Sequence, residues 1–251
     1  MSRNAARAGM VRLVSRLLAL GGIVALLVLP AVAGDRAHLD MIGYSDDGSY
    51  FAFEEFGIQD GSGFAYSSIY VIDLIDDSWA VGTPIRVLAE DEREPLTEIR
   101  AAAKDKAANY ITTLGIDVPG EFVAMVGDGV PGDDGQTLTF GVPRVGAGDV
   151  DGSHTLKMSR FGTTSATPCL EWFGSAPRGY QLEVEGETGT RIVHRDDSLP
   201  RSRGCPVDYR LYGVVLPISD APLPHAAAII SVYTFGFEGP DRRFIVVPLG
   251  F

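Results

Sequence analysis

The sequence contains few of the residues that carry metal-dependent or redox chemistry. Only two cysteines and four histidines occur among 251 residues. Neither a Cys-x-x-Cys nor a His-Glu-x-x-His motif is present, and no two histidines are spaced four residues apart. These absences exclude a thioredoxin-like redox pair and the helix-borne zinc sites of metalloproteases.

Motifs of nucleotide binding and serine hydrolysis are also missing. Glycine-rich stretches such as residues 127–129 contain no lysine and lack P-loop spacing. Residues 43–47 approach a Gly-x-Ser-x-Gly elbow, but Asp47 replaces the last glycine. His194 and Asp196 offer a base beside a carboxylate, although such a charged run is more typical of a solvated loop end. The sequence predicts no catalytic residue and no cofactor.

Basic residues are outnumbered by acidic ones. Lysine and arginine total 21 against 33 aspartates and glutamates, which gives a net charge of −12. A strongly acidic surface repels nucleic acid and anionic lipid head groups at long range. We therefore expect no nucleic-acid partner, and instead a protein or another component of the cell envelope.

Hydrophobic runs long enough to span a membrane are absent after residue 33. Before it, four arginines precede an apolar run over residues 17–32, and an Ala-x-Ala motif ends at Ala33. This order is typical of a secretory signal peptide, with an uncleaved anchor helix as the alternative. Cleavage after Ala33 would leave 218 residues and, by removing the four arginines, change the net charge from −12 to −16. We expect a periplasmic or secreted product, a single domain over residues 34–251, with no stable membrane span.

Cys169 and Cys205 both lie in the predicted exported part. An isolated cysteine pair in an oxidising compartment is expected to form a disulfide. Closing a loop of about 37 residues would stabilise the chain by roughly 3–4 kcal/mol through the entropy of the unfolded state. We predict a structural Cys169–Cys205 disulfide.

Residues 40–74 have the pattern of three antiparallel strands. A strand ends at Ser45, Asp46-Asp47-Gly48 offers a tight turn, and residues 50–54 alternate in polarity. A loop rich in Gly, Asp and Ser follows, and residues 68–74 form a third strand. Alternation places Phe51 and Phe53 on one face, where we expect core.

Residues 95–114 change to helical spacing. Pro95 suits a first helical turn, alanines raise helix propensity, and Gly115 provides a stop. Ile99, Ala103, Tyr110 and Leu114 should face the sheet.

From Glu121 onward, short apolar segments separated by Gly, Pro and Asp predict further strands, and residues 231–247 read as a closing hairpin. The fold class is therefore mainly β, an antiparallel sandwich or incomplete propeller-like sheets with one packed α-helix over about residues 95–114. A full propeller would require a similar unit every 40–45 residues, and only one such unit is visible.

Two resemblances accompany this pattern. The first resemblance is to one blade of the propeller repeats in TolB-type periplasmic proteins. It is carried by residues 45–53 and 69–74, which include Ser45-Asp46-Asp47-Gly48 and Ile69-Tyr70-Val71-Ile72-Asp73-Leu74. The mature chain as a whole resembles an uncharacterised family of predicted secreted bacterial proteins, domain of unknown function 2259. The matching features include residues 42–45, 51–57, 59–63, Trp79 and residues 82–84. This resemblance implies export and brings no activity or catalytic residues.

Acidic loops are the one pattern that suggests a metal. Residues 46–47, 59–62, 128–134 and 149–153 supply oxygen ligands of the kind that calcium prefers. The last begins like an EF-hand loop, but His154 and Arg160 replace the required Gly and Glu. Asp-Gly pairs also form hairpin turns without an ion, which is the preferred interpretation, with calcium as the alternative.

Two functional hypotheses remain. The first is an exported, non-catalytic binding module, with Asp60 and the loop aromatics Phe64 and Tyr66 as candidate binding residues. Packing of Phe64 and Tyr66 over the sheet edge is the alternative role. The second hypothesis is a secreted hydrolase with a site assembled from scattered Asp, Glu and His residues. Buried carboxylates with raised pKa values in a cleft would favour the hydrolase, and a flat aromatic or apolar patch would favour the binding module.

Overall fold

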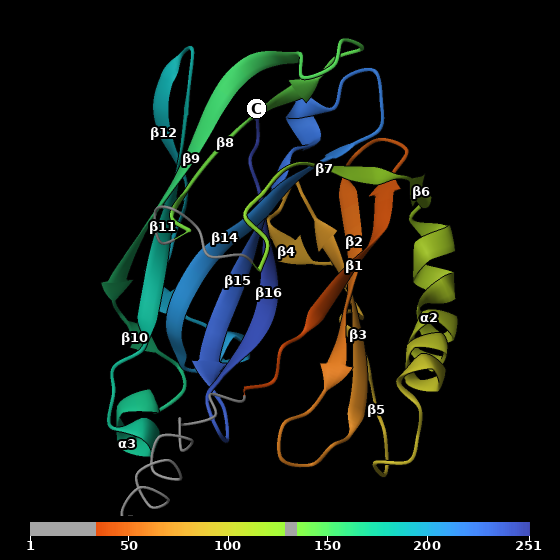
Figure 1. Ribbon diagram of the computed structural model, residues 1–251, viewed down its shortest axis with the longest axis vertical. Helices are drawn as coiled ribbons and strands as arrows, with labels where there is room; N and C mark the ends of the chain where they lie inside the picture. The colour runs from red at the N-terminus through yellow and green to blue at the C-terminus, as the bar shows by residue number, and fades with distance from the viewer. Residues whose placement is uncertain (1–33, 129–134) are drawn as a thin grey trace, which may run out of the picture. The chain divides into compact units, whose positions relative to one another are not determined.

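The computed structural model describes residues 34–128 and 135–251 (Figure 1). The predicted signal peptide and its cleavage site at Ala33 lie outside the described residues, as do Asp133 and Asp134 of the acidic loops. Within the described part of the chain, no helix is both long and apolar enough to cross a membrane. Antiparallel strands dominate, which confirms the predicted fold class.

The first sheet, here called the N-terminal sheet, contains the predicted meander. Its strands are β1 (His38–Ser45), β2 (Tyr50–Ile58), β3 (Ala65–Asp73), β4 (Ser78–Trp79), β5 (Ile85–Leu88) and β6 (Ile116–Val118). Strands β1, β2 and β3 pair antiparallel in chain order, as predicted. In the first turn, the Gly48 N–H donates to the Ser45 carbonyl at 2.9 Å. Gly48 has a φ of 69°, a conformation that glycine adopts without strain.

Helix α2 (Leu96–Thr113) covers the face of the N-terminal sheet that points away from the rest of the strands (Figure 1). Ile99, Ala103 and Ala107 are its buried residues, and Ala103 and Ala107 pack against Ile69 of β3. The predicted register is therefore confirmed at Ile99 and Ala103. The helix ends before Gly115, whose φ is 60°.

The second sheet, here called the central sheet, is built from the last part of the chain together with one earlier strand. It has the order β16 (Pro240–Pro248), β15 (Ala227–Phe235), β14 (Pro206–Pro217) and β7 (Gly120–Met125). The hairpin of β15 and β16 was predicted from the sequence and is confirmed.

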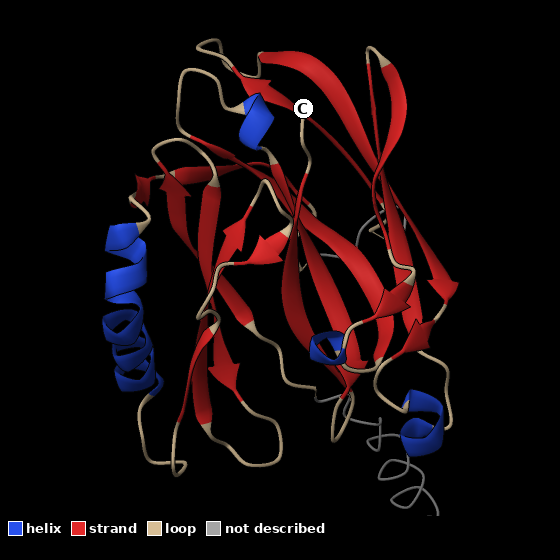
Figure 2. Cartoon of the chain, turned by 180° about the vertical axis from the view of Figure 1, so that it is seen from behind, coloured by secondary structure: helices blue, strands red, loops and turns tan. Residues whose placement is uncertain are grey.

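The third sheet, here called the outer sheet, has the order β12 (Gly189–Arg195), β11 (Arg178–Gly186), β9 (Val150–Gly162) and β8 (Thr137–Pro143). It packs on the central sheet, on the side away from the N-terminal sheet (Figures 1 and 2).

The central sheet is buried on both faces. Ala227 and Ile229 contribute to the core shared with the N-terminal sheet, whereas Ala228 and Ile230 contribute to the core shared with the outer sheet. All four side chains are fully buried. Successive residues of a strand point to opposite faces, so a strand with apolar residues at every position can join two cores.

The core between the N-terminal and central sheets contains the predicted aromatic residues. Phe51 and Phe53 are 0% and 1% exposed, which confirms their assignment to the core. Burial of one such side chain contributes about 1.5–3 kcal/mol. Tyr44 crosses this interface and its hydroxyl donates to the Val215 carbonyl at 3.1 Å.

The predicted disulfide is confirmed. Cys169 and Cys205 are bonded and close a sequence separation of 36 residues. The bond joins two short stretches, here together called the disulfide segment: β10 (Thr164–Ser165) with α3 (Cys169–Phe173), and β13 (Ser198–Leu199) with the 3-10 helix η1 (Arg201–Arg203). Helix α3 was not predicted, because five residues are too few to show helical spacing. A second 3-10 helix, η2 (Leu223–His225), precedes β15.

Candidate functional site

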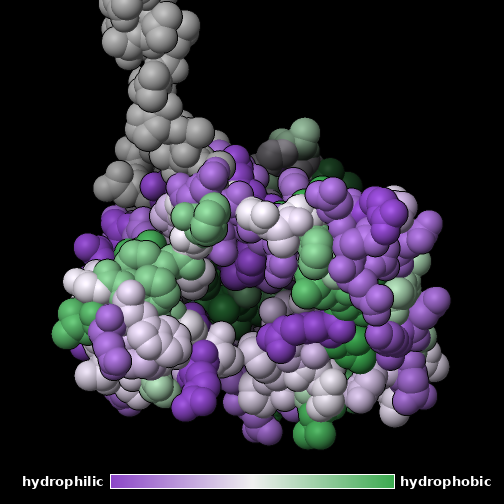
Figure 3. All heavy atoms as spheres, turned by 90° about the horizontal axis from the view of Figure 1, so that it is seen from below, coloured by the Kyte–Doolittle hydropathy of each residue, from purple (hydrophilic) through white to green (hydrophobic). Residues whose placement is uncertain are grey.

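A cleft of about 790 Å³ lies where the three sheets and the disulfide segment meet. This volume is in the range of pockets that hold small organic ligands. Among its lining residues are Glu55, Tyr66, Tyr70, Trp79 and Arg86 of the N-terminal sheet, Phe235 and Arg243 of the central sheet, Tyr180 and His194 of the outer sheet, and Trp172, Phe173, Arg201 and Arg203 of the disulfide segment. The face seen in Figure 3 is hollowed between two groups of side chains, with hydrophobic residues deep in the hollow.

Aromatic side chains from several elements line the cleft. Trp79 is 41% exposed and lies edge-on to Tyr70, with ring centroids 5.6 Å apart. On the disulfide segment, Phe173 stacks on Phe235 of β15 at 4.4 Å, and Trp172 beside it is 62% exposed. Exposed aromatic faces provide apolar contact area for the rings or chains of a ligand.

Two arginines of the cleft are not held in a salt bridge, although the charge of Arg86 acts on Glu55. Arg86 and Arg201 are exposed, and neither forms a salt bridge with another described residue. The guanidinium of Arg86 lies over the Trp79 ring, 5.9 Å from its centroid. In a protein of net charge −12, these groups make the cleft locally positive and suited to an anionic ligand.

Consecutive glutamates of β2 are buried on opposite faces of the N-terminal sheet. Glu54 points toward α2, where Arg100 donates to both of its carboxylate oxygens at 2.9 and 2.7 Å. Ser67 and Lys104 lie 2.8 and 3.2 Å from the same carboxylate. Burial raises the pKa of Glu54, but these partners outweigh burial and lower the pKa below its ordinary value.

Glu55 points the other way, toward the cleft and the central sheet. Its Oε2 accepts a hydrogen bond from the Phe244 N–H at 2.7 Å. Strand β16 is at the edge of the central sheet, so Glu55 satisfies a backbone donor that has no neighbouring strand on that side. Burial raises the pKa of Glu55 to about 7, although the charge of Arg243 opposes the rise.

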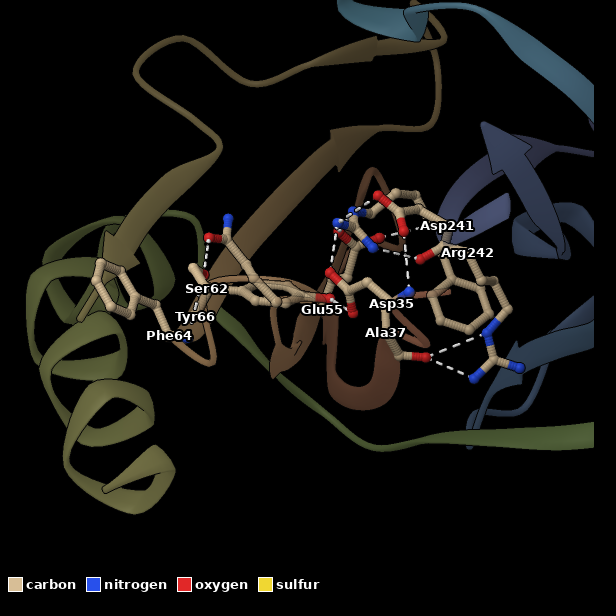
Figure 4. A network of polar contacts seen from close by, with 11 residues as sticks. Asp35, Ala37, Glu55, Ser62, Phe64, Tyr66, Asp241 and Arg242 are labelled. Atoms are coloured by element: carbon tan, nitrogen blue, oxygen red, sulfur yellow. Dashed lines mark hydrogen bonds and ion pairs between the residues drawn. The ribbon is translucent and has the colours of Figure 1, made fainter. Parts of the chain in front are cut away.

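A second buried carboxylate, Asp35, belongs to the same network (Figure 4). Arg243 donates to its Oδ2 at 2.6 Å, and the Tyr66 hydroxyl donates to its Oδ1 at 3.1 Å. Burial raises the pKa of Asp35, and the charge of Arg243 offsets part of that rise. Beside it, Arg242 donates to the Ala37 carbonyl at 3.2 and 2.5 Å. The network joins the start of the described chain to β2, β3 and β16.

His194 and Asp196 form a pair at the outer-sheet side of the cleft. Their Nε2 and Oδ1 atoms are 3.1 Å apart, and Asp77 lies 3.8 Å from Nδ1. Burial lowers the pKa of His194, but the hydrogen bonds to Asp196 and Asp77 dominate and raise it to about 9. The imidazole is therefore protonated at neutral pH and is not a general base there.

The interpretation of residues 194–197 as a solvated loop end was wrong for His194 and Asp196. His194 lies in β12 with a side chain that is 19% exposed, and Asp196 is buried. The Asp196 carboxylate also accepts the Tyr180 N–H at 3.0 Å, and Arg203 lies 3.7 Å from it. Compensated charges can be buried where unpaired charges cannot.

The three candidate binding residues do not share one surface. Asp60 remains in the loop between β2 and β3 and accepts the Glu238 N–H at 3.3 Å. Phe64 packs beside Leu96 and Ile99 of α2. In Figure 4, Tyr66 extends toward Asp35 and Glu55, whereas Phe64 points the opposite way.

The placement of Tyr66 in a loop was wrong. Strand β3 begins at Ala65, three residues earlier than predicted, so Tyr66 is a strand residue with 7% exposure. Its burial follows from its contact with Asp35 and from the cation–π contact of Arg243, whose guanidinium lies 5.1 Å from the ring centroid. Tyr66 nevertheless lines the cleft.

The acidic loops do not gather into a metal site within residues 34–128 and 135–251. No group of three or more His, Cys, Asp or Glu side chains there is placed to hold an ion. Several acidic residues instead shape turns. Asp47 accepts hydrogen bonds from Ser45 and Ser49 at 2.7 and 2.9 Å, and Asp73 accepts from the Ile75 and Asp76 N–H groups at 3.0 Å.

The raised pKa values predict an unusual dependence of stability on pH. Between pH 4.5 and about 7, folded Glu55 retains a proton that the unfolded chain has lost. Between pH 6.5 and about 9, folded His194 likewise retains a proton that its unfolded counterpart has lost. Because the folded state binds more protons, the free energy of unfolding should fall as the pH rises through this window. The urea midpoint should therefore decrease from about pH 5 to about pH 9.

Two variants separate the contributions. Glu55→Gln should remove the pH dependence of the urea midpoint below about pH 7. His194→Gln should remove it above about pH 7. The lowered pKa values of Glu54 and Asp196 affect the stability only at acidic pH. There the free energy of unfolding falls as these carboxylates are protonated. A midpoint that rises steadily from pH 5 to pH 9 would contradict the assignment.

Comparison with known proteins places the chain in a family. The family model described as "Predicted secreted protein (DUF2259)" matches residues 52–249. No curated protein and no solved structure matches the chain. The disulfide agrees with a location outside the cytoplasm, where thiols oxidise. Because the match covers most of the chain, this protein belongs to the DUF2259 family of predicted secreted proteins.

Proposed function

We propose that the protein is a secreted, non-catalytic binding module of the bacterial envelope whose cleft holds a small ligand or a narrow projecting part of a partner. The observation that carries this proposal is the combination of aromatic faces and exposed arginines around one concavity of about 790 Å³. A concave site of this size fits a small molecule better than it fits a flat protein surface. The TolB-type blade likeness of residues 40–74 agrees with a binding role.

The charged groups of the cleft support binding rather than turnover. His194 is protonated at neutral pH, and Glu55 already accepts the Phe244 N–H. A hydrolase requires a base that can take a proton from water or from a nucleophile. The hydrolase remains the second candidate, because burial raises the pKa of Glu55 to about 7 in the cleft and a general acid requires such a value.

The tryptophans allow a direct test. The chain has two, Trp79 and Trp172, and both line the cleft. Protein recovered from the culture medium of its own bacterium should release a bound small molecule on denaturation, identifiable by mass spectrometry. Adding the molecule back to ligand-free protein should change the tryptophan emission in a saturable way.

Trp79→Ala should weaken binding by about tenfold, equivalent to about 1.4 kcal/mol. The matched control is Phe237→Ala, because Phe237 is 82% exposed and does not line the cleft. Equal affinities of both variants and wild type would refute a cleft site. Recovery of the ligand unchanged supports binding, whereas turnover abolished in Glu55→Gln would establish the hydrolase instead.

A further inference from the structure

Three buried polar atoms beside the cleft lack a hydrogen-bond partner among the described residues. They are the hydroxyls of Tyr180 and Tyr209 and the Nη1 of Arg203. Both tyrosines are 0% exposed, so bulk water does not solvate their hydroxyl groups. A buried donor without a partner destabilises the fold, which makes such a cluster a sign of an additional binding partner.

The three residues are neighbours. The rings of Tyr180 and Tyr209 have centroids 4.8 Å apart, and the Arg203 guanidinium carbon lies 5.7 Å from the Tyr180 centroid. Burial raises the pKa of both tyrosines, and the positive charge of Arg203 opposes the rise in both. Tyr180 and Arg203 also line the cleft, so the cluster is continuous with the proposed ligand site.

The donors without hydrogen-bond partners favour an anionic ligand that accepts hydrogen bonds. Asp196 already has close partners in His194 at 3.1 Å and the Tyr180 N–H at 3.0 Å, and Arg203 is farther away at 3.7 Å. At that distance the Arg203 Nη1 forms an ion pair with Asp196 but no hydrogen bond. One guanidinium N–H and two phenol O–H groups can donate to the oxygens of a carboxylate.

We propose that Arg203, Tyr180 and Tyr209 form a carboxylate-binding subsite, and that the ligand of the cleft is a small organic acid whose remaining part contacts the aromatic side chains. This inference rests on the proposed binding function. It adds the chemical class of the ligand and assigns a role to three groups that have no hydrogen-bond partner among the described residues.

Phenylacetate and its uncharged counterpart phenylacetamide are suitable probes, with acetate and inorganic phosphate for comparison. Titration of the ligand-free secreted protein, followed by calorimetry and tryptophan emission, should show that phenylacetate binds at least tenfold more tightly than phenylacetamide. Arg203→Gln should remove this difference. Phosphate should bind more weakly than phenylacetate.

Tyrosine variants provide a test that does not depend on the stability of Arg203→Gln. Tyr180→Phe and Tyr209→Phe each remove a hydroxyl without a partner, so neither should lower the unfolding temperature. Each should weaken phenylacetate binding three- to tenfold. The control is Tyr44→Phe, because the Tyr44 hydroxyl donates to the Val215 carbonyl at 3.1 Å and the residue does not line the cleft. Tyr44→Phe should lower the unfolding temperature and leave affinity unchanged.

Four outcomes would overturn the subsite. Equal affinity for phenylacetate and phenylacetamide would show that the negative charge is not recognised. Tighter binding of phosphate than of phenylacetate would show that the site does not select a carboxylate. Unchanged affinity in both tyrosine variants would mean that their hydroxyls hold only water. Absence of binding by every probe would also overturn it. The proposed binding function is judged separately, by the molecule released from the secreted protein and by Trp79→Ala.

Discussion

Replacing Cys169 and Cys205 by serine is expected to lower the free energy of unfolding by about 3–4 kcal/mol. The disulfide closes a sequence separation of 36 residues, and removing it restores conformational freedom to the unfolded chain. Both half-cystines are buried, at 2% and 5% exposure, so the serines would also place polar hydroxyls in an apolar setting. Urea unfolding of the double variant beside the wild type measures the loss.

Reductant supplies the control for this experiment. Reducing the wild type should lower its unfolding midpoint toward that of the variant, whereas the same treatment should leave the variant unchanged. Ligand affinity should fall as well, because the disulfide holds together the stretches that carry Trp172, Phe173 and Arg203. A variant as stable as the oxidised wild type would show that the bond contributes nothing to the fold.

The second large effect concerns the ion pair beneath α2. Arg100→Met should destabilise the fold by about 3 kcal/mol, because it leaves Glu54 as a buried carboxylate without its bidentate partner. The Glu54 side chain is 0% exposed, and Lys104, which lies 3.2 Å away, is 49% exposed and offers weaker compensation. Chemical denaturation at pH 7 and constant ionic strength measures the change.

Two further variants define the origin of this loss. Arg93→Met breaks a surface pair with Asp91, in which the Arg93 side chain is 86% exposed, and should cost less than about 1 kcal/mol. The double variant Glu54→Met and Arg100→Met removes both charges and should be more stable than Arg100→Met alone. If Arg100→Met and Arg93→Met had equal effects, burial of Glu54 would not be the cause.

Local sequence patterns were sufficient to predict most of the secondary structure. The turn at Asp46-Asp47-Gly48 and the polarity of β2 located the meander, and alanine-rich spacing with Gly115 located α2. These signals are carried by neighbouring residues, so they can be read without knowledge of tertiary structure. The order of the three sheets depends instead on which buried faces meet. The unbroken apolar run at the start of β15 was the local sign of a strand buried on both faces.

The cleft could not be predicted in the same way. Its lining residues extend from Phe53 to Val247, and no spacing rule connects residues so far apart. Polar residue types were also misleading about burial. Glu54, Glu55 and Asp196 appear in the sequence as surface residues, yet each is buried because an arginine, a histidine or a backbone N–H from another element compensates it.

The position of the central sheet has a consequence for biosynthesis. Three of its four strands lie between Pro206 and Pro248, whereas the N-terminal and outer sheets are complete by Arg195. During synthesis or passage across a membrane, the two flanking sheets therefore emerge before the layer that covers their apolar faces. A chain that lacks its last 45 or so residues would lose β14, β15 and β16 and expose both cores to aggregation. The native state cannot form until the C-terminal strands have emerged. An exported chain would therefore stay incompletely folded until its translocation is nearly finished.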